Sequence, residues 1–132
     1  RRLGAQRLRQ LRAEGGDAGF WPAPREAEAV TAKDICMAAQ AGDGTAQAIV
    51  EESAAYLGMG LSVLIDLFNP ERIVIGSIFA RAEALFRPGM EAVIAREALA
   101  QSAAVCRVVP AQLGDSIGDV AALTIAIEFS KR

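Results

Sequence analysis

The tripeptide Gly76-Ser77-Ile78 follows a short apolar segment, as a turn between a strand and a helix does. In open α/β sheets, ligands bind beyond the carboxyl ends of the strands, where the loops leave room. Glycine there lets a nucleotide approach the backbone, and the Ser77 hydroxyl can donate a hydrogen bond to a phosphate or ribose. A tight turn also needs glycine for its own geometry, so the tripeptide alone leaves a binding role and a structural role open.

A second glycine-containing turn, LGDSIG at residues 113–118, precedes the last apolar segment. The unpaired N–H groups of a following helix could receive an anion at this turn. Ser116 and Asp119 are equally well explained as capping residues of that helix. This turn is therefore a second candidate for ligand binding and carries no specific signal of its own.

Catalytic and metal-binding groups are scarce. The chain has no histidine, and Cys36 and Cys106 lie 70 positions apart in apolar surroundings, so they predict buried structural thiols and no closed zinc site. No lysine-containing phosphate loop or nucleophile elbow occurs. Each aspartate fits a cap, a loop or the surface, and none has a catalytic partner: Asp17, Asp34, Asp43, Asp66, Asp115 and Asp119. We predict no catalytic residue and no metal ligand in this chain.

The elements that position the turns are mostly helices. Leucines at helical spacing predict a first helix that ends at Glu14, and Thr31 with Asp34 forms the pattern of a capping box. Residues 44–68 predict a central helix of roughly 25 residues, about 37 Å long. Its small residues, which recur every four positions, permit close approach by another helix or a second subunit: Ala54, Gly58 and Ser62.

Two short strands follow the central helix. Residues 72–76 lack polar alternation, which predicts burial on both faces, and residues 105–109 predict a second strand. Helices over 79–86 and 89–100, separated at Pro88, connect them as a right-handed crossover between parallel strands. The last helix, residues 120–129, is apolar on much of its circumference, so we expect it to be buried against the sheet.

Composition supports one α/β domain. Of 132 residues, 52% are hydrophobic and only 5% aromatic, which favours helices on a small sheet. The net charge of −2 predicts no nucleic-acid binding, and the arginines near the start indicate a solvated helix face more than a phosphate-binding arm. The longest apolar stretch, residues 54–68, is too short to span a bilayer and predicts a core helix. The two structural thiols lead us to expect a cytoplasmic protein. A start without methionine suggests a piece of a longer chain.

Four separated blocks resemble the ROK family in order and spacing. They cover about residues 30–130, and the last block contains the second candidate turn: AAQAGD (38–43), YLGMGLS (56–62), FNPERIVIG (68–76) and LGDSIGDVAA (113–122). The family contains bacterial sugar kinases and sugar-responsive transcriptional repressors. Both are built on the actin-like, ribonuclease-H-like ATPase fold, which has two lobes and a cleft between them.

The resemblance implies that residues 1–132 form a single C-terminal lobe, helix-rich with a small, mostly parallel sheet, and that residues 1–30 are a helix and loop entering it. The family's phosphate loop, catalytic aspartate and zinc site all lie upstream of such a lobe. Its nucleotide turn usually reads as two or three glycines. Gly76 matches the first glycine, whereas Ser77 and Ile78 depart from the pattern, and bulk at Ile78 would restrict the approach of a nucleotide.

Three functions follow as expectations. The first is part of an ATP-dependent sugar kinase, in which Gly76 and Ser77 face ATP with Mg²⁺ while the missing N-terminal lobe supplies the base and the sugar contacts. The second is part of a sugar-responsive repressor with an N-terminal helix-turn-helix, which the Gly-Ser-Ile turn favours. The third is a non-catalytic dimerisation module. We also expect a homodimer, with no membrane or nucleic-acid contact through this chain.

Overall fold

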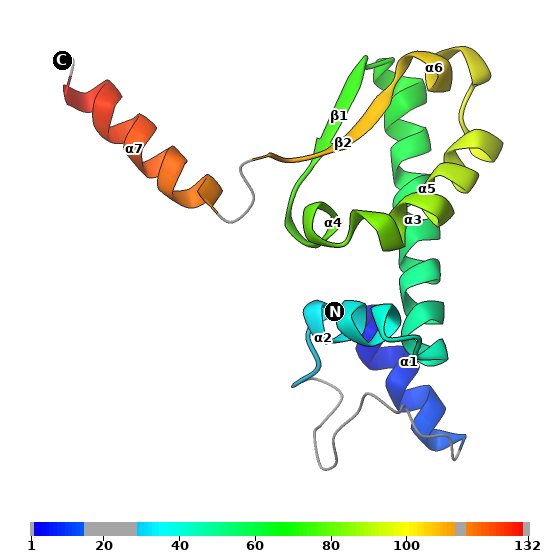
Figure 1. Cartoon of the computed structure of the whole chain (residues 1–132). Coiled ribbons are helices and arrows are strands. Elements are labelled where there is room, and N and C mark those ends of the chain that lie inside the picture. Colours follow the sequence, from blue (N-terminus) through cyan, green and yellow to red (C-terminus); the bar gives the residue numbers. More distant parts are fainter. Residues whose placement is uncertain (1, 15–28, 113–115, 131–132) are drawn as a thin grey trace.

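The computed structural model describes residues 2–14, 29–112 and 116–130 (Figure 1). Most of the described chain is helical, with one small parallel sheet. The elements are α1 (Arg2–Ala13), α2 (Ala32–Gln40), α3 (Gly44–Phe68), β1 (Arg72–Ile75), α4 (Ser77–Arg81), α5 (Glu83–Glu97), α6 (Ala100–Val105), β2 (Arg107–Pro110) and α7 (Ile117–Ser130). Much of the expected entry segment, at 15–28, lies outside the described residues, as do residues 113–115 of the second candidate turn.

The predicted capping residues begin and end the helices as expected. The Thr31 side chain accepts a hydrogen bond from the Asp34 N–H, and the Asp34 carboxylate accepts one from the Thr31 N–H, which completes the capping box of α2. The Asp43 carboxylate accepts from the Ala46 N–H at 2.8 Å and begins α3. Asn69, in the left-handed conformation, ends α3 after 25 residues.

Helix α3 is the centre of the molecule, and α5 crosses it at close range. The small residues Ala54, Gly58 and Ser62 are all buried on the face of α3 that meets α5, which confirms their predicted packing role. An added Cβ at Gly58 would lie 2.7 Å from both the Met90 carbonyl oxygen and the Val93 Cβ. Glycine is therefore required there by the approach of the two backbones.

By length and composition alone, α3 is also the one helix in the described part of the chain that could cross a membrane. Its buried residues instead form the main core with α1, α2 and α5. This packing is that of a core helix.

The helices after β1 differ from the prediction at Pro88. The structure places the break at Ala82 and the proline inside a continuous α5. Phe86, Met90 and Val93, which flank the proline on both sides, are buried. The packing of α5 on α3 therefore compensates the backbone hydrogen bond that proline removes.

The two strands pair in parallel, with Ile73 opposite Val108. Strand β2 begins two residues later than predicted, because 105 still belongs to α6, and it includes Pro110. The expectation of burial on both faces is wrong for β1: Ile73 and Ile75 pack against the core, but Val74 on the opposite face is 60% exposed. No described element covers that face.

The last helix forms as predicted but is not buried against the sheet. Helix α7 stands clear of the other elements (Figure 1), and all of its described side chains are exposed, including Phe129 at 72%. The two-stranded sheet packs Ile73 and Ile75 against the main core on one face, and α7 does not cover Val74 on the other.

The close contact of α3 with α5 gives a paired test. We expect Gly58→Ala to lower the free energy of unfolding by about 2 kcal/mol, because the new methyl group must displace the α5 backbone. Gly60→Ala, two residues away on α3 with open space around it, should raise that free energy by up to about 1 kcal/mol. Urea unfolding followed by circular dichroism measures both. Equal effects of the two substitutions would contradict the proposed contact.

Candidate functional site

The carboxyl ends of β1 and β2 meet at one edge of the molecule, beside α4 (Figure 1). Ile75 lies opposite Pro110, and the Ala111 N–H donates to the Ile75 carbonyl at 2.9 Å. The turn that begins at Gly76 therefore lies beside Ala111, two residues before the second candidate turn. Of that second turn, Ser116 and the backbone of residues 117 and 118 are described. This is the place where open α/β sheets bind ligands.

Gly76 is not required by the geometry of its turn. Its φ of −95° is open to any residue. An added Cβ would meet only the Ala111 Cβ, at 3.7 Å, which is an ordinary van der Waals distance. The fold of this chain would therefore accept a side chain at position 76.

Ser77 adopts the conformation that normally calls for glycine. Its φ is +57°, in the left-handed region, and its side chain is exposed. Such a conformation costs a residue with a Cβ roughly 1–3 kcal/mol of free energy. The backbone at Ser77 thus has a conformation that glycine favours, and the Ser77 side chain is exposed at the turn.

Ile78 and Phe79 hold the other side of the turn. Phe79 is buried, with its ring centroid 6.5 Å from that of Phe86 on α5, and Ile78 packs against the same core. The bulk of Ile78 is therefore at least partly taken up by the protein interior. Ser77 and Ile78 both replace glycines of the family's turn; the Ser77 side chain is exposed, whereas that of Ile78 is half-buried.

Arg87 fixes β2 relative to α5. Its guanidinium donates to the Val108 carbonyl at 3.2 Å and pairs with Glu83 and Glu91 on its own helix. The hydrogen bonds that Arg87 donates to the Glu83 and Glu91 carboxylates raise the pKa of its guanidinium. The side chain therefore links the strand that ends at the site to the helix that packs on α3.

The described residues contain no group of three histidine, cysteine or acidic side chains that could hold a metal ion. Cys36 is buried and Cys106 half-buried, both as free thiols. Burial raises the pKa of each thiol, which disfavours the reactive thiolate. These observations agree with the interpretation of both cysteines as structural.

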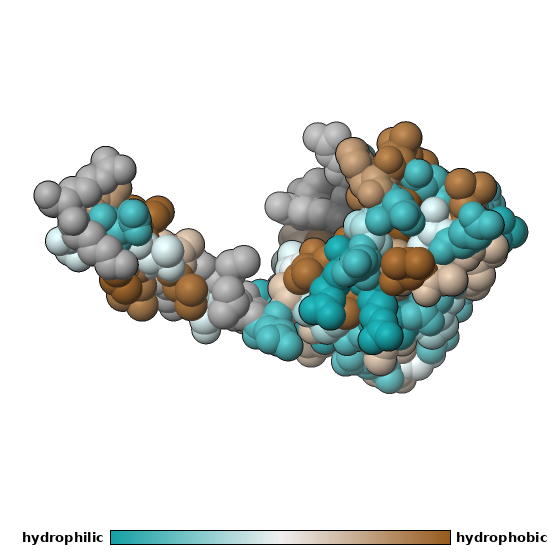
Figure 2. All heavy atoms as spheres, turned by 90° about the horizontal axis from the view of Figure 1, so that it is seen from above, coloured by the Kyte–Doolittle hydropathy of each residue, from teal (hydrophilic) through white to brown (hydrophobic). Residues whose placement is uncertain are grey.

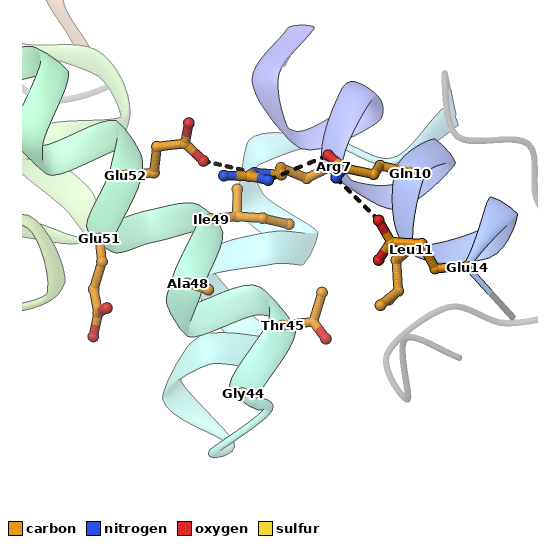
Figure 3. Close-up of a pocket in the computed structure, with 10 residues that line it drawn as sticks. All are labelled: Arg7, Gln10, Leu11, Glu14, Gly44, Thr45, Ala48, Ile49, Glu51 and Glu52. Atoms are coloured by element: carbon orange, nitrogen blue, oxygen red, sulfur yellow. Dashed lines mark hydrogen bonds and ion pairs between the residues drawn. The ribbon is translucent and has the colours of Figure 1, made fainter. Parts of the chain in front are cut away.

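A separate hollow of about 600 Å³ lies between α1 and the first half of α3 (Figure 3). Sequence reasoning did not find it. Arg7 donates to Glu52 at 2.8 Å across the hollow and to Gln10 at 3.2 Å, and Glu52 raises the pKa of Arg7. Glu14 and Glu51 also line it, so among the described lining residues three carboxylates accompany one arginine. Such a lining disfavours phosphate, and Arg7 is explained as an ion-pair residue.

The family model of the ROK family matches residues 6–128, nearly the whole chain. The chain belongs to the ROK family. This confirms the resemblance on which the expected fold and function rest. The small parallel sheet among helices is the α/β arrangement predicted for a lobe of this family.

Curated relatives include both functional classes of the family. The chain is 38% identical over 69 residues to the DNA-binding transcriptional dual regulator NagC of Escherichia coli. The matched region covers 52% of this chain and 17% of that protein. It is 42% identical over 60 residues to a glucokinase of Halalkalibacterium halodurans. That matched region covers 45% of this chain and 18% of the enzyme. The matches thus span less than a fifth of these relatives.

Solved structures give the same two classes. A ROK family transcriptional regulator homologous to the Mlc protein of E. coli superposes with a TM-score of 0.69 and 29% identity, covering 82% of this chain and 26% of that one. A protein of Cytophaga hutchinsonii assigned as a sugar kinase superposes with a TM-score of 0.76 and 17% identity, covering 95% and 40%. At 17% identity the second likeness shows the fold alone.

The conformation of Ser77 can be tested directly. Ser77→Gly should raise the free energy of unfolding by about 1 kcal/mol, because relief at φ +57° exceeds the entropy that glycine loses on folding. Ser77→Ala keeps a Cβ and should give no such gain. Thermal unfolding of the three proteins measures the difference. A gain from alanine equal to that from glycine would show that the left-handed conformation is not the cause.

Proposed function

We propose that this chain is the C-terminal lobe of a ROK sugar-responsive transcriptional regulator, in which it closes against the rest of the protein around a sugar. The observation that carries the proposal is Ser77, whose side chain stands at the strand end where the family's kinases have glycine facing the nucleotide. The 38% identity to NagC and the 29% identity to the regulator structure support it. DNA contact would be made outside these residues.

The second candidate is an ATP-dependent sugar kinase, the function that the resemblance in sequence favours first. In that case the lobe holds the nucleotide side, and Gly76 with Ser77 faces ATP and Mg²⁺. The open space at Gly76 and the 42% identity to a glucokinase support it. The base would come from the missing N-terminal lobe, because the described residues show no carboxylate with a catalytic partner at the turn.

Both candidates share further expectations. The partners would be a small-molecule sugar, the missing N-terminal lobe and a second copy of the protein, and the location would be the cytoplasm.

A purely non-catalytic dimerisation module is the third candidate. Its support is the apolar surface that α3 leaves open near its end, where Leu67 and Phe68 are each 71% exposed.

Nucleotide affinity of the longer protein separates the first two candidates. We expect no binding of a non-hydrolysable ATP analogue with Mg²⁺ at millimolar concentration by calorimetry, together with sugar-dependent binding to promoter DNA in a gel shift. A kinase would instead bind the analogue, and Gly76→Ala would then weaken that binding at least about tenfold without lowering the melting temperature, since the fold has room for the methyl group. Gly60→Ala, on α3 and away from the turn, also has room for its methyl group; it is the matched control and should leave any such binding intact.

A further inference from the structure

Strand β2 has one edge that faces away from β1. The N–H groups of Arg107 and Ala111 donate to carbonyls at the two ends of β1, at 3.0 and 2.9 Å. Successive residues of a strand direct their backbone groups alternately to its two edges. Val108 and Pro110, which alternate with these residues, therefore direct their backbone groups to the edge away from β1. We call this edge the outer edge of β2.

Arg87 occupies the outer edge at Val108. Its guanidinium reaches across from α5 and donates to the Val108 carbonyl at 3.2 Å. Glu83 and Glu91, about one turn of α5 before and after it, accept hydrogen bonds from the same guanidinium. A side chain that is already held by two ion pairs loses little further freedom when it binds the carbonyl. The outward acceptor at Val108 is therefore already used within the chain.

Pro110 limits the outer edge at its next outward position. Proline has no backbone N–H, so it has no donor to offer to an added strand. Glu91 also lies by the strand, since it lines a small hollow of about 250 Å³ together with Val108. A strand added at this edge would have to displace Arg87 and bury the charges of Glu83 and Glu91.

The sequence of β2 shows why such protection matters. Residues 105–110 read VCRVVP and contain three β-branched valines with a single charge. Segments of high β propensity and low charge pair with strands of other chains when their edge is exposed. An unprotected outer edge would therefore make this segment a site of association.

We propose that Arg87 protects the outer edge of β2 against the addition of a strand from another polypeptide, in the first place the β2 of a second copy. Pro110 contributes to the same protection. The proposal rests on the contacts between α5 and β2, and it does not depend on the choice between regulator and kinase.

The test uses the longer protein, read from the coding sequence upstream of Arg1. Exposed hydrophobic side chains occur on the main body of this chain and on α7, which stands apart from it (Figure 2). Such surfaces can cause association of their own. Each variant is therefore compared with the unmodified longer protein at equal concentration, and the additional assembly is measured.

Arg87→Met removes the donor and the charge but keeps a long side chain. We expect assemblies larger than those of the unmodified protein to form at least about tenfold faster, measured by light scattering. The amides of residues 107–110 should exchange more slowly with deuterium in these assemblies, because the outer edge is then paired. Arg87→Lys keeps a charge and a donor, so its assembly rate should stay within about twofold of the unmodified protein.

Two control variants separate edge protection from a loss of stability. Arg96→Met removes an exposed arginine of the same helix that pairs with Glu97, and it should leave the assembly rate unchanged. Gly58→Ala weakens the contact of α3 with α5 without changing β2. It is compared with Arg87→Met at equal free energy of unfolding, adjusted with urea. If Gly58→Ala then assembles as fast as Arg87→Met, unfolding is the cause and the proposal is wrong.

Two other results would also overturn the proposal. One is an unchanged assembly rate in Arg87→Met, and the other is fast assembly without slower exchange at residues 107–110. If Arg87→Met fails to fold, Pro110→Ala decides, because it restores an outward N–H on β2. We expect it to assemble at least about threefold faster than the unmodified protein. An unchanged rate in Pro110→Ala would then reject the protection of this edge.

Discussion

The absence of a side chain at Gly58 is the constraint on which the arrangement of the lobe depends. Because α3 has no Cβ there, the carbonyl of Met90 and the side chain of Val93 can approach its backbone directly. A second glycine, Gly89 on α5, faces Ala54 on α3, where an added Cβ would lie 3.1 Å from the Ala54 Cβ. The two helices are thus fitted to one another from both sides, and side chains such as Met90 are completely buried between them.

Arg87 links α5 to the strands that end at the candidate site. Its guanidinium reaches from α5 to the Val108 carbonyl of β2, and β2 in turn pairs with β1 through the register that places Ile75 opposite Pro110. Phe86 on α5 meets Phe79 just beyond the turn. The location of the turn at Gly76 therefore depends on both the pairing of the two strands and the packing of α4 on α5.

Local signals in the sequence predicted the helices well. The capping box at Thr31, the cap at Asp43 and the stop at Asn69 act within a few residues, so the start of α2 and both ends of α3 were predicted correctly. Pro88 shows the limit of such reasoning, because the contact that keeps α5 helical comes from α3, far away in the sequence. The site shows it too: the sequence gives no sign that Ser77, and not Gly76, has the left-handed conformation.

The remaining disagreements share one cause. Val74 and the side chains of α7 were expected to be buried, and those that the structure describes are exposed. Phe68 at the end of α3 is exposed as well. An apolar pattern indicates that a segment is stable when it is buried. The residues that bury it need not belong to the same 132 residues. The matched regions make up less than a fifth of the curated relatives, so most of such a protein lies beyond this lobe. The exposed apolar surfaces lie on one face of β1, at the end of α3 and on α7.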